Sequence, residues 1–212
     1  MFLTLEGVEG SGKSTLAQHL AGRLEQRGKT VLHTREPGGC LLGRDIRALL
    51  LDSGRAVEPR AELYLFLADR AQHVEEIIRP ALGRGEWVIC DRYADSTIAY
   101  QGAGRGMNSD WLQRLNDDAT GGLWPDITFL LDLPEELGLE RALRRNAESG
   151  LGKTEGRFEA ETLAFHHRVR QGFLARAEAF PRRFNILDAS LPPENVAEAA
   201  WNELIRHGFI EG

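Results

Sequence analysis

The feature that most constrains the fold is a glycine-rich segment near the N-terminus. It reads Gly7-Val8-Glu9-Gly10-Ser11-Gly12-Lys13-Ser14 and matches the pattern G-x-x-x-x-G-K-[ST]. A short β-rich run, Phe2 to Leu5, precedes it, and a helical pattern from Ser14 to Arg27 follows. Glycines let the backbone fold back so that its N–H groups point inward as a nest for anions. The segment therefore predicts a phosphate-binding loop between a strand and a helix.

Two side chains in this loop have chemistry that suits a bound nucleoside triphosphate. Lys13 offers a point charge to the β- and γ-phosphates. The hydroxyl of Ser14 can hold magnesium, an ion that takes few protein ligands and keeps several waters. The motif specifies the triphosphate and leaves the reaction open, because GTPases, ATPases and small-molecule kinases share it.

The rest of the chain alternates between strand and helix patterns, which predicts an α/β fold with a parallel sheet. The further strands are expected at Thr30 to Thr34, Trp87 to Cys90, Asp126 to Leu131 and Phe184 to Leu187. Further helices are expected from Pro59 to about Arg79 and from about Pro193 to His207. The apolar strands read as buried on both faces, so we expect helices to cover the sheet on both sides. The 212 residues suggest a single domain, residues 1–212.

Charged residues follow the second and third predicted strands directly. Arg35 lies after Thr34, and Asp91 and Arg92 lie after Cys90. Ligands of such sheets bind beyond the carboxyl ends of the strands, which is where the phosphate loop also lies. An aspartate there can organise magnesium, and an arginine can fork onto a phosphate. We therefore expect one active site at this edge.

The composition restricts the class of protein. The formal net charge of −6 argues against a protein that coats nucleic acid, because such binding needs a basic surface. No apolar run approaches the ~20 residues of a membrane span, and Glu6 and Glu9 interrupt the apolar N-terminus before a secretory signal could form. Two cysteines are too few for a disulfide framework. We expect a cytoplasmic protein that binds neither nucleic acid nor a membrane.

Among the classes that share the loop, a small-molecule kinase fits the remaining residues best. A GTPase would need a guanine-reading N-K-x-D segment, which the sequence lacks. A motor or transporter ATPase would usually be longer. Two alternatives stay open: another nucleoside or nucleotide kinase on the same fold, and a nucleotide-binding regulator without useful catalysis.

Three further features are an aromatic and arginine pair, a basic segment and two adjacent histidines. Phe66 and Arg70 lie four apart on a predicted helix, so they share a face. That pair suits a nucleobase, although from spacing alone a core phenylalanine with an arginine at its edge is the commoner arrangement. The segment from Arg144 to Arg157 is basic and glycine-rich, and we expect a mobile loop there that includes Arg145 and Lys153. The adjacent His166 and His167 are expected on a helix surface.

Taken together, these segments resemble the thymidylate kinase family, in its bacterial type. The matching stretches occur in the family's order and span most of the chain. They are Leu5-Glu6-Gly7-Val8-Glu9-Gly10-Ser11-Gly12-Lys13-Ser14-Thr15, Thr34-Arg35-Glu36-Pro37-Gly38-Gly39, Ala68-Asp69-Arg70-Ala71-Gln72-His73, Asp91-Arg92-Tyr93 with Ser96, Ala99-Tyr100-Gln101-Gly102, Leu131-Asp132-Leu133-Pro134 and Arg157-Phe158-Glu159.

The resemblance implies a three-layer P-loop kinase fold with a five-stranded parallel sheet, and transfer of a phosphoryl group from ATP with Mg²⁺ to dTMP. The residues implied to bind ATP are Gly7, Val8, Glu9, Gly10, Ser11, Gly12, Lys13, Ser14 and Thr15. Those implied to bind dTMP are Glu9, Arg35, Pro37, Phe66, Arg70, Arg92, Ser96, Tyr100 and Gln101. In particular, Phe66 would stack on thymine, Arg70 would hydrogen-bond it, and Tyr100 would crowd the 2′ position.

The resemblance also implies catalytic groups and an assembly. The basic segment from Arg144 to Arg157 is implied to be a lid over ATP. Ser11 occupies a position in the phosphate loop where some family members carry a basic residue, so the resemblance places the catalytic arginines in this lid. The implied catalytic residues are Lys13, Asp91, Arg92, Arg145 and Arg157, with Ser14 and Asp91 at the metal. The chain departs from many relatives at Gly156, where they have an acidic residue. A homodimer is implied as well.

Overall fold

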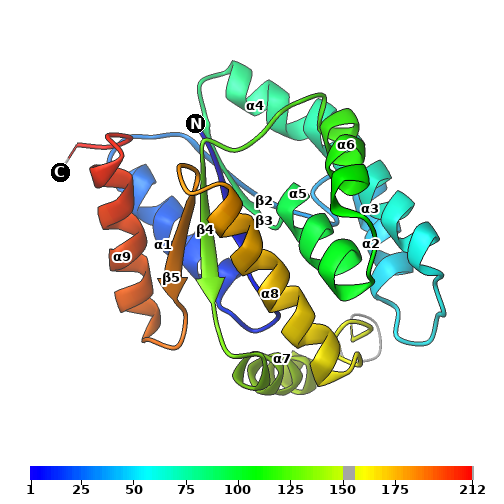
Figure 1. Cartoon of the computed structure of the whole chain (residues 1–212). Coiled ribbons are helices and arrows are strands. Elements are labelled where there is room, and N and C mark those ends of the chain that lie inside the picture. Colours follow the sequence, from blue (N-terminus) through cyan, green and yellow to red (C-terminus); the bar gives the residue numbers. More distant parts are fainter. Residues whose placement is uncertain (150–155, 212) are drawn as a thin grey trace.

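The computed structural model describes residues 1–149 and 156–211. In that part of the chain five strands form one all-parallel sheet in the order β2-β3-β1-β4-β5 (Figure 1). The strands are β1 (Phe2–Glu6), β2 (Val31–Arg35), β3 (Trp87–Asp91), β4 (Ile127–Asp132) and β5 (Phe184–Asp188). Each lies within one residue of its predicted bounds, because a buried parallel strand is a short apolar run that ends in polar residues.

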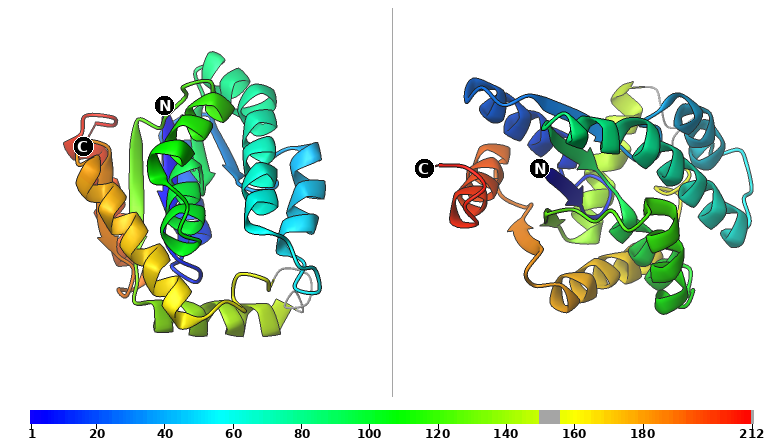
Figure 2. Two further views of the ribbon diagram at one scale, coloured as in Figure 1. Left: turned by 45° about the vertical axis from the view of Figure 1, so that its right-hand side comes forward. Right: turned by 90° about the horizontal axis from the view of Figure 1, so that it is seen from above.

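Helices cover both faces of this sheet, as the sequence predicted (Figures 1 and 2). They are α1 (Lys13–Gln26), α2 (Leu41–Leu51), α3 (Pro59–His73), α4 (Arg79–Gly83), α5 (Ala94–Thr97), α6 (Ser109–Thr120), α7 (Glu135–Ser149), α8 (Leu163–Ala179) and α9 (Pro193–Arg206), with π-helical turns η1 (Val74–Ile78) and η2 (Ile98–Gly104). Helices α1 and α9 pack together on one face, and α8 crosses the other face against η2. The α/β class is confirmed.

The core between α1 and the sheet follows from the spacing of leucines on the helix. Leu20 and Leu24 are fully buried and share a cluster with Leu3 and Leu5 of β1. Burying each leucine side chain stabilises the fold by roughly 1.5–3 kcal/mol. This packing fixes the start of α1 relative to the end of β1, which is the geometry that the phosphate loop requires.

The register of the strands brings the charged loops to one edge. Asp91 at the end of β3 pairs with Leu5 of β1 on one side and with Arg35 of β2 on the other. Helix α7 lies across the carboxyl end of β4, below the loop that follows β1 (Figures 1 and 2). The segments that were expected to meet therefore surround one space.

The helix expected from Pro59 to about Arg79 is present, with a π-helical turn that the sequence did not indicate: α3 passes without a break through η1 into α4, which ends at Gly83. One other expectation was wrong. The basic segment from Arg144 is not a loop at its start, because α7 continues to Ser149. Its acidic and basic side chains face solvent, so the segment lacks the apolar stripe by which a packed helix is usually found.

The middle of that basic segment, residues 150–155 with Lys153, lies outside the described residues. Over the described ranges, no helix is both long and apolar enough to cross a membrane.

Candidate active site

A cleft of about 690 Å³ opens at the carboxyl ends of the strands. Its floor is the phosphate loop from Glu9 to Thr15, and its walls come from the ends of β2 and β3, from α3 and η2, and from α7. One continuous space therefore connects the loop that suits a triphosphate with the Phe66 and Arg70 pair. A donor and an acceptor nucleotide need this arrangement if their phosphates are to meet.

The phosphate loop is held against α7 by a close approach of two glycines. Gly10 has φ of 70°, and a Cβ there would lie 2.1 Å from the carbonyl oxygen of Gly138. A Cβ on Gly138 would in turn lie 2.6 Å from the carbonyl oxygen of Glu9. Real Cβ atoms do not approach backbone so closely, so any larger residue would push α7 away from the loop.

Lys13 is folded into the phosphate loop. Its ammonium donates hydrogen bonds to the carbonyl oxygens of Gly7 at 3.1 Å and Val8 at 2.8 Å, and to Ser11 Oγ at 3.1 Å. Burial lowers the pKa of Lys13 to about 8, with Arg92 adding to the effect and Asp91 opposing it. The Lys13 ammonium is therefore shielded from solvent and lies against the backbone of the loop. A phosphate anion bound there would interact with this charge strongly, because little water screens it.

The head of α1 meets the end of β3 through one short hydrogen bond. Ser14 Oγ donates to Asp91 Oδ2 at 2.6 Å. Hydroxyl and carboxylate oxygens are hard ligands, and magnesium is usually bound in proteins through one or two carboxylates plus substrate phosphates. The donor set thus fits the magnesium site expected from the sequence.

Arg92 lines the cleft and has a strained backbone conformation. Its φ is 68°, in the left-handed region that costs a residue with a Cβ on the order of 1 kcal/mol or more. Its guanidinium donates to the carbonyl oxygen of Gly7 at 2.9 Å and to Glu9 Oε1 at 3.0 Å. The strain aims this side chain at the phosphate loop.

The carboxylate of Glu9 collects several donors. Tyr100 Oη donates to its Oε1 at 2.5 Å, and His166 Nδ1 lies 3.4 Å from its Oε2. Burial alone would raise the pKa of Glu9, but Arg92, the nearby His166 and the hydrogen bond from Tyr100 outweigh burial and hold that pKa far below its ordinary range. Glu9 is therefore an anion and a hydrogen-bond acceptor in the cleft at neutral pH.

A second acid, Glu6, supports the turn that carries Arg92. Its carboxylate accepts hydrogen bonds from the Tyr93 amide at 2.9 Å and from Ser96 Oγ at 2.6 Å. Burial, reinforced by the nearby charge of Asp95, raises the pKa of Glu6 to about 8. Glu6 thus holds the chain that follows the strained residue.

The far part of the cleft has an aromatic wall and a polar edge. Phe66 lies 6.1 Å from Phe158, centroid to centroid, and Phe158 packs edge-on against Tyr100 at 5.5 Å. Arg70, Thr97 and Gln101 line the same space. A flat, partly apolar group with hydrogen-bonding atoms on its rim suits this pocket.

Arg70 is 1% exposed and its orientation is fixed by surrounding acceptors. It donates to Glu36 Oε2 at 2.8 Å, Thr97 Oγ1 at 2.7 Å, Asn116 Oδ1 at 2.9 Å and the Tyr93 carbonyl oxygen at 3.0 Å. A guanidinium has five N–H donors, so these contacts leave one on Nη2 for the cleft.

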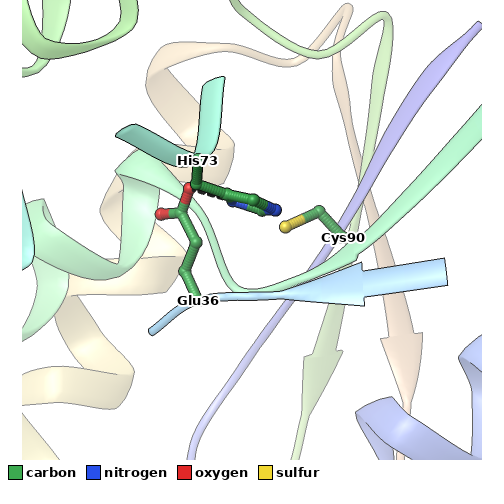
Figure 3. A group of neighbouring side chains, drawn as sticks. All are labelled: Glu36, His73 and Cys90. Atoms are coloured by element: carbon green, nitrogen blue, oxygen red, sulfur yellow. Dashed lines mark hydrogen bonds and ion pairs between the residues drawn. The ribbon is translucent and has the colours of Figure 1, made fainter. Parts of the chain in front are cut away.

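The acid that holds Arg70 is itself held by a histidine. Glu36 Oε1 hydrogen-bonds His73 Nδ1 at 2.9 Å, and His73 Nε2 hydrogen-bonds Thr34 Oγ1 at 2.7 Å. Figure 3 shows the His73 ring between the Glu36 carboxylate and the Cys90 sulfur. These three side chains bring potential metal ligands within 4.8 Å of one another. Cys90 Sγ donates a hydrogen bond to the Arg92 carbonyl oxygen, so every potential ligand atom of the three side chains already has a hydrogen-bond partner. We therefore interpret the group as a structural support for Arg70, which Glu36 holds.

The arginines of α7 form one side of the cleft. Arg141, Arg144 and Arg145 line it, and Arg145 Nη2 lies 3.3 Å from Glu159 Oε1. Arg157 is not among the described residues that line the cleft. Its guanidinium instead pairs with Glu62 Oε2 at 2.8 Å and bonds the Leu50 carbonyl oxygen.

Comparison with known proteins assigns this architecture to a family. A sequence profile of the thymidylate kinase family matches residues 5–200. The chain belongs to the thymidylate kinase family. Members of this family are kinases that phosphorylate dTMP to dTDP with ATP.

Individual relatives agree with this assignment. Thymidylate kinase from Solidesulfovibrio magneticus is 57% identical over 202 residues, which cover 95% of this chain and 97% of that protein. The one from Thermomicrobium roseum is 52% identical over 210 residues, covering 98% and 97%. The crystal structure of thymidylate kinase from Ehrlichia chaffeensis superposes with a TM-score of 0.77 at 33% identity, covering 96% of this chain and 98% of that one. The P-loop kinase fold is thereby confirmed.

The structure brings most of the expected thymidylate kinase site residues to the cleft. Those lining it are Glu9, Gly10, Ser11, Gly12, Lys13, Ser14, Thr15, Arg35, Pro37, Phe66, Arg70, Asp91, Arg92, Ser96, Tyr100, Gln101 and Arg145. Gly7 lies just below it, with its carbonyl oxygen bonded to both Lys13 and Arg92. Val8 is 3% exposed and belongs to the core cluster.

Sequence reasoning missed several cleft residues. Thr97 and Phe158 line the same part of the cleft as Phe66 and Arg70. Thr97 gave no signal by itself, but Phe158 lies inside the Arg-Phe-Glu stretch that carried the family resemblance. At the opposite end, an apolar wall of Ala189, Leu191, Pro193 and Val196 continues the cleft beyond Arg141. No charged motif marks that wall.

One histidine assignment was wrong. His167 is exposed, as expected, but His166 is 1% exposed and lies against Glu9. Helix α8 packs against η2, and neighbouring positions on a helix face different directions, so His166 turns inward to Glu9 while His167 turns to solvent.

Proposed function

We propose that this cleft binds ATP and dTMP end to end and transfers the γ-phosphoryl group in line to the dTMP phosphate. The observation that carries the proposal is the continuity of the cleft. The phosphate loop lies at one end, the pocket of Phe66 and Arg70 lies at the other, and Arg92 stands between them. ATP occupies the loop and the apolar wall beyond Arg141, and dTMP occupies the aromatic pocket.

The acceptor needs no general base. A phosphate monoester has a second pKa of about 6, so it is already mostly a dianion at neutral pH. The difficulty is that one anion must approach another. Catalysis therefore consists of positioning and of neutralising charge, and the cleft supplies cations for both purposes.

Five cationic side chains share this work. Lys13 lies in the loop beneath the β- and γ-phosphates, and Arg92 and Arg35 hold the acceptor phosphate. Arg145 covers the transferred group from the side of α7. Arg157, which pairs with Glu62 at 2.8 Å in this structure, leaves that acid and joins Arg145 when the lid closes. Ser14 and Asp91 would hold Mg²⁺, which neutralises charge on the β- and γ-phosphates when it is bound with ATP. An arginine brought to the transferred phosphoryl group by lid closure contributes ~10³-fold or more to kcat in other phosphoryl-transfer enzymes.

The sugar and base of dTMP are read by separate groups. Glu9 accepts a hydrogen bond from the 3′-hydroxyl, and Tyr100, which Glu9 anchors, crowds the 2′ position against ribonucleotides. The ring of Phe66 stacks on thymine, and the remaining donor of Arg70 reads O4. Ser96 and Pro37 complete the pocket.

We further propose that the enzyme works as a cytoplasmic homodimer. Both cysteines are free and buried, which suits a reducing compartment. Helices α2 and α3 expose large apolar side chains, with Leu41 at 72% and Tyr64 at 49%. Exposed apolar surface of this kind is typical of an interface.

The test is a panel of acceptors in a coupled assay of ADP release. We expect dTMP to be preferred over dUMP, dCMP and dGMP, with no appreciable release in the absence of an acceptor. Equal rates across the panel would refute the thymine assignment. ATP binding without acceptor-dependent release would instead identify a nucleotide-binding regulator.

A further inference from the structure

Glu62 is a buried acid beside the acceptor pocket that the reaction above does not use. It lies in α3 one helical turn before Phe66, so both residues share a face of the helix. Its side chain is 0% exposed. A carboxylate in such a place costs several kcal/mol of desolvation unless partners offset it.

Partners from two distant segments surround this carboxylate. Gln101 Nε2 of η2 donates to Glu62 Oε1 at 2.8 Å. Arg105 Nη2 lies 3.1 Å from Oε2, and Arg157 Nη2 lies 2.8 Å from the same oxygen. Glu62 therefore connects the base pocket to the chain that leaves the lid segment.

The contact with Gln101 decides which way its amide faces. An ionised carboxylate only accepts hydrogen bonds, so the NH₂ group of Gln101 must point toward Glu62. The carbonyl oxygen Oε1 is then the group that Gln101 offers to the cleft it lines. Without Glu62 the Gln101 amide could present either its oxygen or its NH₂ group to the cleft at nearly equal free energy, because the two groups differ little in size.

We propose that Glu62 is a positioning residue for base specificity, and this rests on the proposed dTMP function. By fixing Gln101 with its oxygen toward the base, Glu62 makes the pocket accept an N–H at ring position 3. Arg70 supplies the donor for the neighbouring O4. This acceptor-and-donor pair matches thymine and uracil and opposes cytosine, which has an acceptor at N3 and an amino group at C4.

The variant that tests this is Glu62→Gln, which keeps the shape of the side chain. Its amide can donate as well as accept, so Gln101 becomes free to turn its NH₂ group toward the cleft. Losing one buried, oriented hydrogen bond of this kind changes discrimination by about 10-fold or more. We expect the ratio of kcat/KM for dTMP to that for dCMP to fall by about that factor.

The same assay contains an internal control. dUMP shares the N3–H and O4 of dTMP and differs by the 5-methyl group, which the Gln101 amide does not read. The ratio of kcat/KM for dTMP to that for dUMP should therefore stay unchanged in Glu62→Gln. A general loosening of the pocket would lower both ratios, and that result would overturn the proposal.

A matched variant elsewhere controls for the loss of a buried acid. Asp95 is 0% exposed and pairs with Arg176 at 2.8 Å and Arg183 at 2.6 Å, but it does not line the described part of the cleft. Asp95→Asn should leave the ratio of dTMP to dCMP as in the wild type. If Asp95→Asn lowers it as much as Glu62→Gln does, then the proposal is wrong.

A double-mutant cycle identifies the route. If Glu62 acts through Gln101, Gln101→Leu lowers the discrimination by itself, and adding Glu62→Gln changes it no further. Independent, additive effects of the two changes would overturn the proposal.

A measurement on the wild-type enzyme covers the case in which Glu62→Gln does not fold. The side-chain amide of Gln101, assigned in ¹⁵N NMR spectra by its loss in Gln101→Leu, should exchange slowly with solvent, with and without dTMP. Fast exchange would overturn the proposal. An enzyme that does not phosphorylate dTMP at all would refute the proposed function instead, whereas normal dTMP kinase activity with an unchanged ratio in Glu62→Gln refutes this inference alone.

Discussion

The hydroxyl of Tyr100 donates a hydrogen bond to Glu9 Oε1 at 2.5 Å, across 91 residues of sequence. The same oxygen accepts from Arg92 Nη2 at 3.0 Å, and the Arg92 guanidinium lies 4.9 Å from the Tyr100 ring centroid. One carboxylate oxygen thus joins the phosphate loop, the strained residue after β3 and the η2 turn. The position of each depends on the others, so changes here should act on substrate binding and on turnover together.

Tyr100→Phe tests the part of this arrangement that faces the sugar. The change keeps the ring and removes the donor to Glu9. A hydrogen bond to a charged group contributes about 1.5–3 kcal/mol, so we expect the KM for dTMP to rise by about 10-fold or more. Steady-state kinetics with dTMP check this. An unchanged KM would show that Glu9 does not depend on Tyr100.

Tyr93→Phe is the matched control for that variant. Tyr93 is buried, and its hydroxyl donates to the Leu123 carbonyl oxygen at 3.0 Å, away from the cleft. The change removes one hydroxyl from one buried tyrosine, as Tyr100→Phe does. We expect some loss of stability from the unpaired carbonyl and a wild-type KM for dTMP.

Arg92→Ala should lower turnover with dTMP by orders of magnitude while ATP binding survives. The guanidinium bridges the Gly7 carbonyl oxygen and Glu9, and no other described side chain makes both contacts. Arg92→Lys keeps the charge but cannot fork, so it should fall between the wild type and Arg92→Ala. Both variants keep a Cβ at φ of 68°, so the backbone cost is the same in each. Calorimetry with ATP and single-turnover kinetics separate the two effects, and near-normal turnover in Arg92→Ala would remove Arg92 from the site.

Glu6 should make the folding stability fall as the pH rises through neutrality. Its pKa is raised from 4.5 to about 8, first by burial and then by Asp95, so the folded state holds a proton that the unfolded state has lost. The contribution of the protonated acid is fully present below pH 4.5 and is lost toward pH 8, with a slope of at most about 1.4 kcal/mol per pH unit. Glu6→Gln removes this proton, so the slope of its free energy of unfolding between pH 5 and 8 should differ from that of the wild type by about this amount. Parallel slopes in urea titrations of the two proteins would show that Glu6 is ionised in the folded protein.

The fold and the central site residues could be predicted because their signals are local. A buried parallel strand is a short apolar run, and a side chain just after it must lie at the carboxyl edge of the sheet. Asp91 ends β3, Arg92 follows it directly, and Arg35 ends β2, so their meeting required only the register of neighbouring strands. The phosphate loop needed even less, because its pattern fixes its own conformation.

The residues that were missed depend on packing between distant segments. Helix α8 buries His166, Val169 and Phe173 on one side against the sheet and η2, but polar residues interrupt its pattern and its apolar stripe is weak. Thr97 accepts a hydrogen bond from Arg70, which is 27 residues away in the sequence, and the residues around Thr97 do not indicate that contact. The hydrophobic pattern of a segment indicates which face of a helix or strand is buried. It does not indicate which other segment packs against that face.

The proposed dimer can be tested on α2, whose first turn exposes Leu41 at 72%. An aspartate in the first turn of a helix interacts favourably with its dipole, so Leu41→Asp should leave α2 intact. A charge buried in an apolar interface without a partner costs several kcal/mol, so the variant should weaken dimerisation by about 10-fold or more. Ile186→Asp is the control, because Ile186 is 53% exposed on β5, at the other edge of the sheet. Sedimentation velocity should show that the wild type and Ile186→Asp are dimers and that Leu41→Asp is dissociated. The reverse pattern for the two variants would place the interface at β5. A monomeric wild type would refute the proposed dimer.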